Sequence, residues 1–251
     1  TVLGKYLFGA AMDKADVEWT LTREPAKLPP GPLGDAGLVF TEPQRDWWWE
    51  EDDDEDDKWS RAGSGQLGPD GTLKITQKLD MSGTTGPQSF TLEADVADTS
   101  YRHIAGRASV VVHPASRYAG VRIEKPWSDV GATVPVQLGV ADREGRPVTG
   151  VTVTARMLAV DWTYIKKPIR GGYDYQWQRT TKEVGSCTAV SGTSPVSCDL
   201  TPPKSGSYEV HAEVDGKRGG QASLWAWGTD GDKPVVPSKG RTLEITPDKA
   251  R

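Results

Sequence analysis

Residues 207–214 read Ser207-Tyr208-Glu209-Val210-His211-Ala212-Glu213-Val214, with apolar and polar side chains in strict alternation. A period of two residues is typical of a β-strand with one buried face. The chain shows no capped helical periodicity. Without helices, a sheet has to bury its apolar face against a second sheet, which predicts an all-β protein of antiparallel β-sandwiches. Further strands are predicted at Val17–Leu21, Leu73–Thr76, Phe90–Val96, Val121–Ile123, Val134–Val140, Val151–Ala155 and Tyr173–Trp177.

A weak internal repeat indicates two domains. Ser89–Val96 parallels Ser207–Val214 in the phase of its aromatic, alanine and valine residues. The period, about 114–134 residues, is the size of one β-sandwich domain. We therefore predict one sandwich over residues 1–114 and a second over 115–230.

The two ends of the chain predict interrupted domains. Leu243–Lys249 is similar to the first strand of the second copy, so residues 231–251 are expected to hold a linker and the first strand of a truncated third domain. Lys5–Gly9 reads as a strand with almost nothing before it, so the first domain is expected to be N-terminally incomplete. We expect the polypeptide to be a piece of a longer array of similar domains.

Residues 24–68 break the pattern and are interpreted as an insertion between strands. Pro and Gly cluster first, followed by Trp47, Trp48 and Trp49 and then by eight consecutive acidic residues at 50–57. Charge runs are usually solvated, which favours a loop. A divalent-cation site is a second interpretation, although the run lacks the glycine-interrupted spacing of an EF-hand. A third is a contact surface for a basic partner or a neighbouring domain, anchored by the three tryptophans.

Cys187 and Cys198 are the only cysteines, and a turn rich in Ser, Thr, Gly and Pro separates them. An even count in a β-rich chain favours a disulfide across a hairpin and an oxidising compartment. Two buried thiols on adjacent strands are the alternative. Two cysteines with no nearby histidine do not make a zinc site, so we predict no metal ligands.

Charge and motifs exclude several classes of function. The net charge is −5, from 30 basic and 35 acidic residues without a Lys/Arg cluster, so no nucleic-acid partner is expected. No apolar run is long enough to span a membrane. Hydrolase elbows, zinc motifs and phosphate or dinucleotide loops are absent, so we predict no catalytic residue and no cofactor. His103, His113 and His211 are expected at strand surfaces or edges. No carboxylate pair stands out, which leaves a glycosidase the weakest hypothesis.

The strands also carry a family pattern. Tyr6–Gly9, Ala15–Trp19 and Leu92–Asp98 resemble a macroglobulin-like domain of bacterial alpha-2-macroglobulins. Val140–Val153, the Cys187/Cys198 pair, Pro203–Tyr208 and Leu224–Gly228 resemble the next such domain. The resemblance covers nearly the whole chain except the acidic insertion, and implies tandem macroglobulin-like β-sandwiches, akin to immunoglobulin and fibronectin-III domains, of which these are the third and fourth.

The resemblance implies a segment of a large extracytoplasmic protease trap, often anchored in the periplasm as a lipoprotein. Such proteins capture endopeptidases through a bait region and, in some members, a thioester in a Cys-x-Glu-Gln motif. Neither Cys187 nor Cys198 begins that motif, and no bait region is identifiable. The expected role is that of non-enzymatic scaffold domains, whose partners are neighbouring domains and, through the full-length protein, target endopeptidases. The alternative is a cell-surface adhesin or recognition module that binds through Trp47, Trp48 and Trp49.

Overall fold

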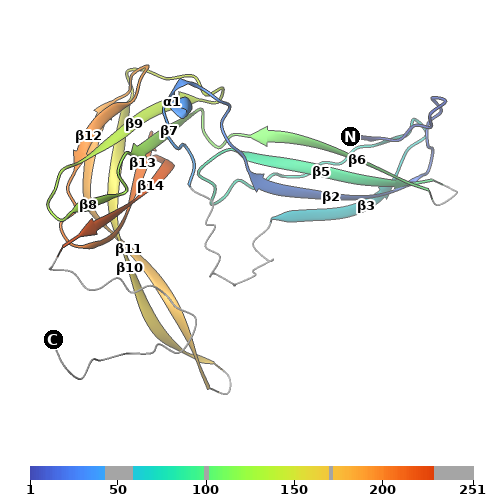
Figure 1. Cartoon of the computed structure of the whole chain (residues 1–251). Coiled ribbons are helices and arrows are strands. Elements are labelled where there is room, and N and C mark those ends of the chain that lie inside the picture. The colour runs from blue at the N-terminus through green and yellow to red at the C-terminus, as the bar shows by residue number, and fades with distance from the viewer. Residues whose placement is uncertain (43–58, 99–101, 170–171, 229–251) are drawn as a thin grey trace, which may run out of the picture.

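The computed structural model describes residues 1–42, 59–98, 102–169 and 172–228. Within these ranges the only helix is the single turn α1 (Pro32–Asp35). All other elements are strands, and they form two β-rich parts that lie side by side in Figure 1. Among the strands that the structure describes, all pairs but one are antiparallel, the exception being β8 beside β14. The prediction of an all-β, antiparallel sandwich fold is confirmed.

The first part is built on a four-stranded sheet in the order β3-β2-β5-β6. Its strands are β2 (Asp16–Pro25), β3 (Ser60–Gln66), β5 (Gln88–Ala97) and β6 (His103–Val112). A two-stranded sheet of β1 (Val2–Leu3) and β4 (Thr72–Leu73) accompanies it. Ile75, Leu79 and Met81 pack over the apolar face of the four-stranded sheet, so irregular chain supplies part of the second layer. The core gathers Met12, Ala15, Val17, Trp19, Leu21, Leu67, Phe90, Ala94 and Val96.

The second part is a sandwich of a five-stranded and a three-stranded sheet. The five-stranded sheet has the order β11-β10-β13-β14-β8 and the three-stranded sheet the order β12-β9-β7. The alternating residues that predict strands supply the core, among them Val136, Leu138, Val153, Tyr208 and Val210. The bounds are β7 (Arg117–Ile123), β8 (Trp127–Asp129), β9 (Val134–Asp142), β10 (Thr152–Ile169), β11 (Gly172–Val190), β12 (Val196–Leu200), β13 (Gly206–Val214) and β14 (Lys217–Trp227).

Strands β10 and β11 are far longer than the sequence predicts. β13 pairs with β10 only over Thr154–Val160, whereas β11 pairs with β10 along its whole length. Beyond Val160 the two strands continue as a ribbon of residues 161–169 and 172–180, which we call the arm. Figure 1 shows the arm projecting away from the sandwich.

Glycine preceded by an acidic residue forms turns in both parts. β13 and β14 are joined by Asp215-Gly216, with Val214 paired to Lys217 and φ angles of 53° and 70° at the two turn residues. A two-residue turn of this kind requires positive φ at both positions. Gly71 and Gly145 also have positive φ. Gly171, between β10 and β11, lies outside the described residues.

The predicted strand over Lys5–Gly9 is wrong. The chain reverses there: the Gly9 amide donates to the Tyr6 carbonyl at 2.8 Å, and Lys5 pairs with Ala11. Leu7 and Phe8 point into solvent at the tip of this turn. β-propensity mostly reflects packing against neighbouring strands. Leu7 is fully exposed, and the Phe8 ring only stacks on the Tyr6 ring of the same turn, with centroids 5.3 Å apart.

The segment interpreted as an insertion, residues 24–68, contains ordered structure at both ends. β2 continues to Pro25, and residues 60–66 form β3, which pairs with β2. Residues 29–41, which we call the strap, cross to the second sandwich. Leu33 and Leu38 are buried there, and Val39 exchanges two backbone hydrogen bonds of 2.9 Å with Val121 of β7. The expectation of a solvated loop is therefore wrong for the strap, while residues 43–58 lie outside the described residues.

Two glycines make room for the strap. Gly120 of β7 and Gly139 of β9 pair directly. A methyl group at Gly139 would lie 2.9–3.0 Å from side-chain carbons of Leu38 and Leu33, and one at Gly120 would lie 2.6 Å from the Phe40 ring. The missing side chains let the strap lie against the sheet. Arg122 adds a 2.7 Å hydrogen bond from Nη1 to the Ala36 carbonyl.

Candidate interaction surfaces

The predicted contact residues cannot be located. Trp47, Trp48 and Trp49, with the acidic run that follows, lie outside the described residues, as does the predicted start of a third domain at 231–251. Among the residues that the structure describes, no group of three or more His, Cys, Asp or Glu side chains could hold a metal ion. The contact surface and the cation site within the acidic run both remain predictions.

The Cys187–Cys198 disulfide is confirmed, with sulfur atoms 2.03 Å apart and Cα atoms 5.8 Å apart. The predicted hairpin setting is wrong. Cys187 lies in β11 of the five-stranded sheet and Cys198 in β12, which pairs with β9 of the three-stranded sheet. The intervening turn carries the chain from one sheet to the other. The bond therefore ties the two layers of the sandwich together.

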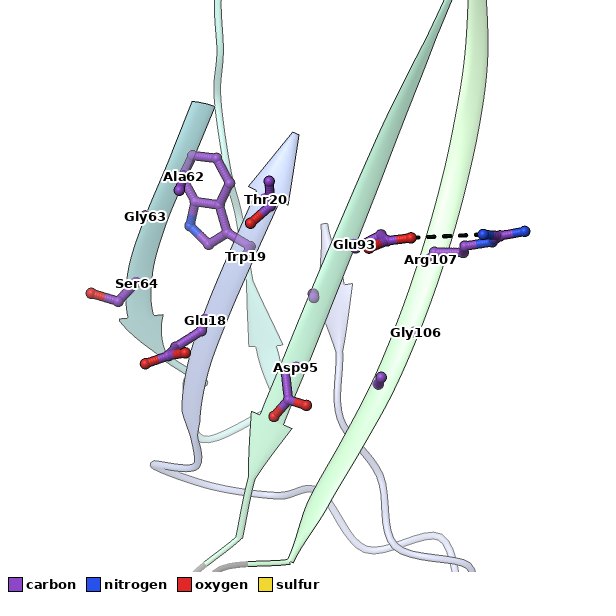
Figure 2. Close-up of a pocket in the computed structure, with 12 residues that line it drawn as sticks. Glu18, Trp19, Thr20, Ala62, Gly63, Ser64, Glu93, Asp95, Gly106 and Arg107 are labelled. Atoms are coloured by element: carbon purple, nitrogen blue, oxygen red, sulfur yellow. Dashed lines mark ion pairs between the residues drawn. The ribbon is translucent and has the colours of Figure 1, made fainter. Parts of the chain in front are cut away.

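An open groove follows the four-stranded sheet of the first part (Figure 2). In its lining, Gly63, Ala94 and Gly106 flank Trp19 in one cross-strand row, and Trp19 and Ala94 turn toward the core of the first part. Glycine at position 63 is required, because a methyl group there would lie 2.4 Å from the Trp19 ring.

Charged side chains in the groove pair across strands. Glu93 and Arg107 form an exposed ion pair of 3.7 Å, the dashed line in Figure 2. Glu18 and Asp95 are neighbours in the register of β2 and β5. The Asp95 carboxylate also forms a 2.6 Å hydrogen bond with His103 Nδ1. The side chains of His103 and Asp95 are 62% and 41% exposed.

The three histidines occupy different environments. His103 lies at an exposed strand end, as expected, and the ring of His113 contacts the Tyr118 hydroxyl at 2.9 Å. His211 is buried, so its expected place at a strand surface or edge is wrong. Sequence alternation placed His211 on the polar face of β13 but could not show that neighbouring side chains cover this face.

A partly buried network of ion pairs lies beside His211. Its Nε2 contacts Glu209 at 3.1 Å, and Glu209 is also paired with Arg179 of the arm. Burial opposes ionisation of Glu209, but hydrogen bonds from His211 and Arg179 outweigh it and lower the pKa of Glu209 to about 2. Arg156 bridges Glu213 at 2.7 Å and Glu183 at 3.0 Å on the same sheet. These ion pairs join the root of the arm to the sheet.

The arm itself carries aromatic pairs. The rings of Tyr164 and Trp177, which are directly paired across β10 and β11, lie 4.9 Å apart. Lys166 Nζ lies 3.6 Å from the centre of the Tyr173 ring, a cation–π contact. No sequence signal placed these residues together, because the pairing of β10 with β11 fixes their contact.

None of the described helical residues forms a segment that could cross a membrane.

Comparison with known proteins identifies relatives of this chain. No family model matches it. It is 25% identical over 248 residues, 97% of this chain and 13% of the relative, to an alpha-2-macroglobulin homologue of Nostoc sp. (strain PCC 7120). The native conformation of Escherichia coli alpha-2-macroglobulin matches with a TM-score of 0.67 and 16% identity, over 94% of this chain and 16% of that one.

A second solved structure agrees. Salmonella alpha-2-macroglobulin reacted with methylamine matches with a TM-score of 0.62 and 16% identity, over 89% of this chain and 15% of that one. The chain thus spans 13–16% of the length of these relatives. Sequence and fold together confirm the predicted resemblance: this chain is similar, along nearly its whole length, to one segment of the bacterial alpha-2-macroglobulins.

Proposed function

We propose that this chain is a non-catalytic scaffold segment of a bacterial protease trap of the alpha-2-macroglobulin type. The observation that carries the proposal is the match over 97% of the chain to an alpha-2-macroglobulin homologue, with the same fold in solved structures. One of these structures is E. coli alpha-2-macroglobulin activated by porcine elastase. Target endopeptidases would be engaged by the full-length protein.

Two features support a scaffold role. Both cysteines are held in the disulfide, so neither is available to form a thioester. The groove on the first part is open and carries no enclosed acid–base pair among the described residues. Bait region and thioester, where present, would lie in other parts of the protein.

The proposal includes a domain assignment and a location. The two parts would be the third and fourth macroglobulin-like domains, divided near residue 114, and residues 113–116 separate β6 from β7. The disulfide supports an oxidising compartment, periplasmic or extracellular. A lipoprotein anchor would be supplied elsewhere in the protein. The alternative of a recognition module gains no support from the described residues, because Trp47, Trp48 and Trp49 are not among them.

Protease inhibition tests the proposal. The full-length protein and the 251-residue chain are each incubated with trypsin or pancreatic elastase, and cleavage of casein is followed. The full-length protein should slow casein cleavage, whereas excess 251-residue chain should leave the rate unchanged. Dose-dependent inhibition by the 251-residue chain would contradict the scaffold role, and no effect of the full-length protein would contradict the trap.

A further inference from the structure

Aromatic side chains form a band across the five-stranded sheet of the second sandwich. One row of paired residues crosses all five strands, through Thr181, Val160, Ser207, Trp225 and Trp127. Two residues further along their strands, on the same face, stand Trp162 of β10 and Trp227 of β14. We call the five apolar residues the aromatic belt: Trp127, Val160, Trp162, Trp225 and Trp227.

The belt faces away from the core of the sandwich. Leu224 and Ala226 are buried in that core, and alternation along β14 turns Trp225 and Trp227 to the other face. These two rings meet edge to face at 5.6 Å. Trp127 and Trp227 are 59% and 60% exposed, an unusual state for the largest apolar side chain.

The arm extends the belt. Along β10, Tyr164 and Lys166 lie on the same face as Trp162, and Trp177 of β11 joins them opposite Tyr164. Tyr164 is 54% exposed and Tyr173 is 61% exposed. Belt and arm therefore form one continuous aromatic surface. Its charged members include Arg179, which is paired with Glu209, Lys166, whose Nζ lies over the Tyr173 ring, and Asp129, which is paired with Trp227.

The length of the arm shows where a partner would sit. The nine residue pairs beyond Val160 span about 30 Å, the width of a sandwich domain, so the arm reaches past its own domain. Ribbons of two strands are marginally stable alone in water, and packing against another surface would stabilise this one. Exposed patches of Trp and Tyr beside an arginine are typical of the centres of protein–protein contacts.

We propose that the aromatic belt and the arm bind a neighbouring β-sandwich domain of the same longer polypeptide, through an apolar surface of that domain. This inference rests on the proposed function, because it requires domains beyond these 251 residues. The relatives supply them: the chain covers only 13% of the curated relative and 16% of the E. coli structure. A protein partner is favoured over a glycan because the belt offers apolar area and few polar groups.

Hydroxyl-radical footprinting with mass spectrometry tests the inference on the full-length protein and on the 251-residue chain. Trp127, Trp227, Tyr164 and Tyr173 are followed, with exposed Phe8 of the first part as the control. Oxidation of the four residues should be about fivefold slower in the full-length protein, because 54–61% exposure falls to that of an interface core. Equal rates in both proteins would overturn the inference. Protection of the four residues that rises with the concentration of the 251-residue chain would also overturn the inference, because it would show that a second copy of the chain covers this surface.

Casein protection is measured on the same samples. A working trap with an exposed belt contradicts only this inference, and a protected belt in a protein that inhibits no protease contradicts only the proposed function.

Discussion

Replacing Leu33 with alanine tests whether the strap is part of the second sandwich. Leu33 is fully buried, although it precedes the first strand of that sandwich by more than eighty residues. Buried leucine-to-alanine changes cost about 2–5 kcal/mol, and the cost is higher where the surroundings cannot close on the cavity. Gly139 beneath Leu33 has no side chain to fill the space. We therefore expect Leu33→Ala to lower the free energy of unfolding by about 3–4 kcal/mol.

Urea unfolding followed by tryptophan fluorescence measures this change. Leu7→Ala is the matched control, because Leu7 is fully exposed and its truncation should change the free energy by less than about 0.5 kcal/mol. Trypsin cleavage at Lys27, next to the strap, should also be faster in Leu33→Ala. Equal stability of the two variants, with no gain in cleavage at Lys27, would refute the packing of the strap on β7 and β9.

Three further predictions concern the second sandwich. The pKa of Glu209 is about 2, below its unfolded value of 4.5, so its ionisation adds at most about 3 kcal/mol to the free energy of unfolding. This contribution is present above pH 4.5 and is lost as the pH falls toward 2. The free energy of unfolding, measured at a series of pH values between 5 and 2, should fall as the pH falls, and Glu209→Gln should reduce this dependence on pH. Reduction of Cys187–Cys198 should lower the free energy of unfolding by about 2–3 kcal/mol, measured in urea with and without a phosphine, and an unchanged midpoint would contradict the stabilising role of the bond. Gly216→Ala should cost about 1–2 kcal/mol because φ is 70° there. The control Gly106→Ala, in β6 of the first part with open space and no positive φ, should leave stability unchanged or raise it by up to about 1 kcal/mol, and equal losses in the two variants would argue against the turn.

Alternating segments were the part of the fold that the sequence could predict. Phe90–Val96, Val134–Val140 and Tyr208–Val214 all lie in strands whose alternate apolar residues line the core, because alternation reports which face of a strand is turned to the core. β3 escaped prediction because Ser60–Gln66 contains two glycines, two serines and no β-branched residue. Only its pairing with β2 makes it a strand.

Long-range contacts could not be predicted from the sequence. The strap depends on Gly120 and Gly139 lying side by side, and nothing within either strand indicates that pairing. The same holds for the disulfide, whose cysteines were predicted to pair but whose strands belong to different sheets. The aromatic surface was missed because Trp127, Trp162 and Trp227 are distant in sequence and meet only through the register of five strands.

The strap also affects how the protein is made. Ribosomes synthesise about 5–20 residues per second, so β9, which ends at Asp142, emerges several seconds after Leu33 and Leu38. Throughout that interval the two leucines have no sheet to cover, while the first part can already begin to fold. The nascent chain therefore exposes an apolar segment until the second sandwich has been synthesised and folded. During that time the segment is a binding site for a chaperone.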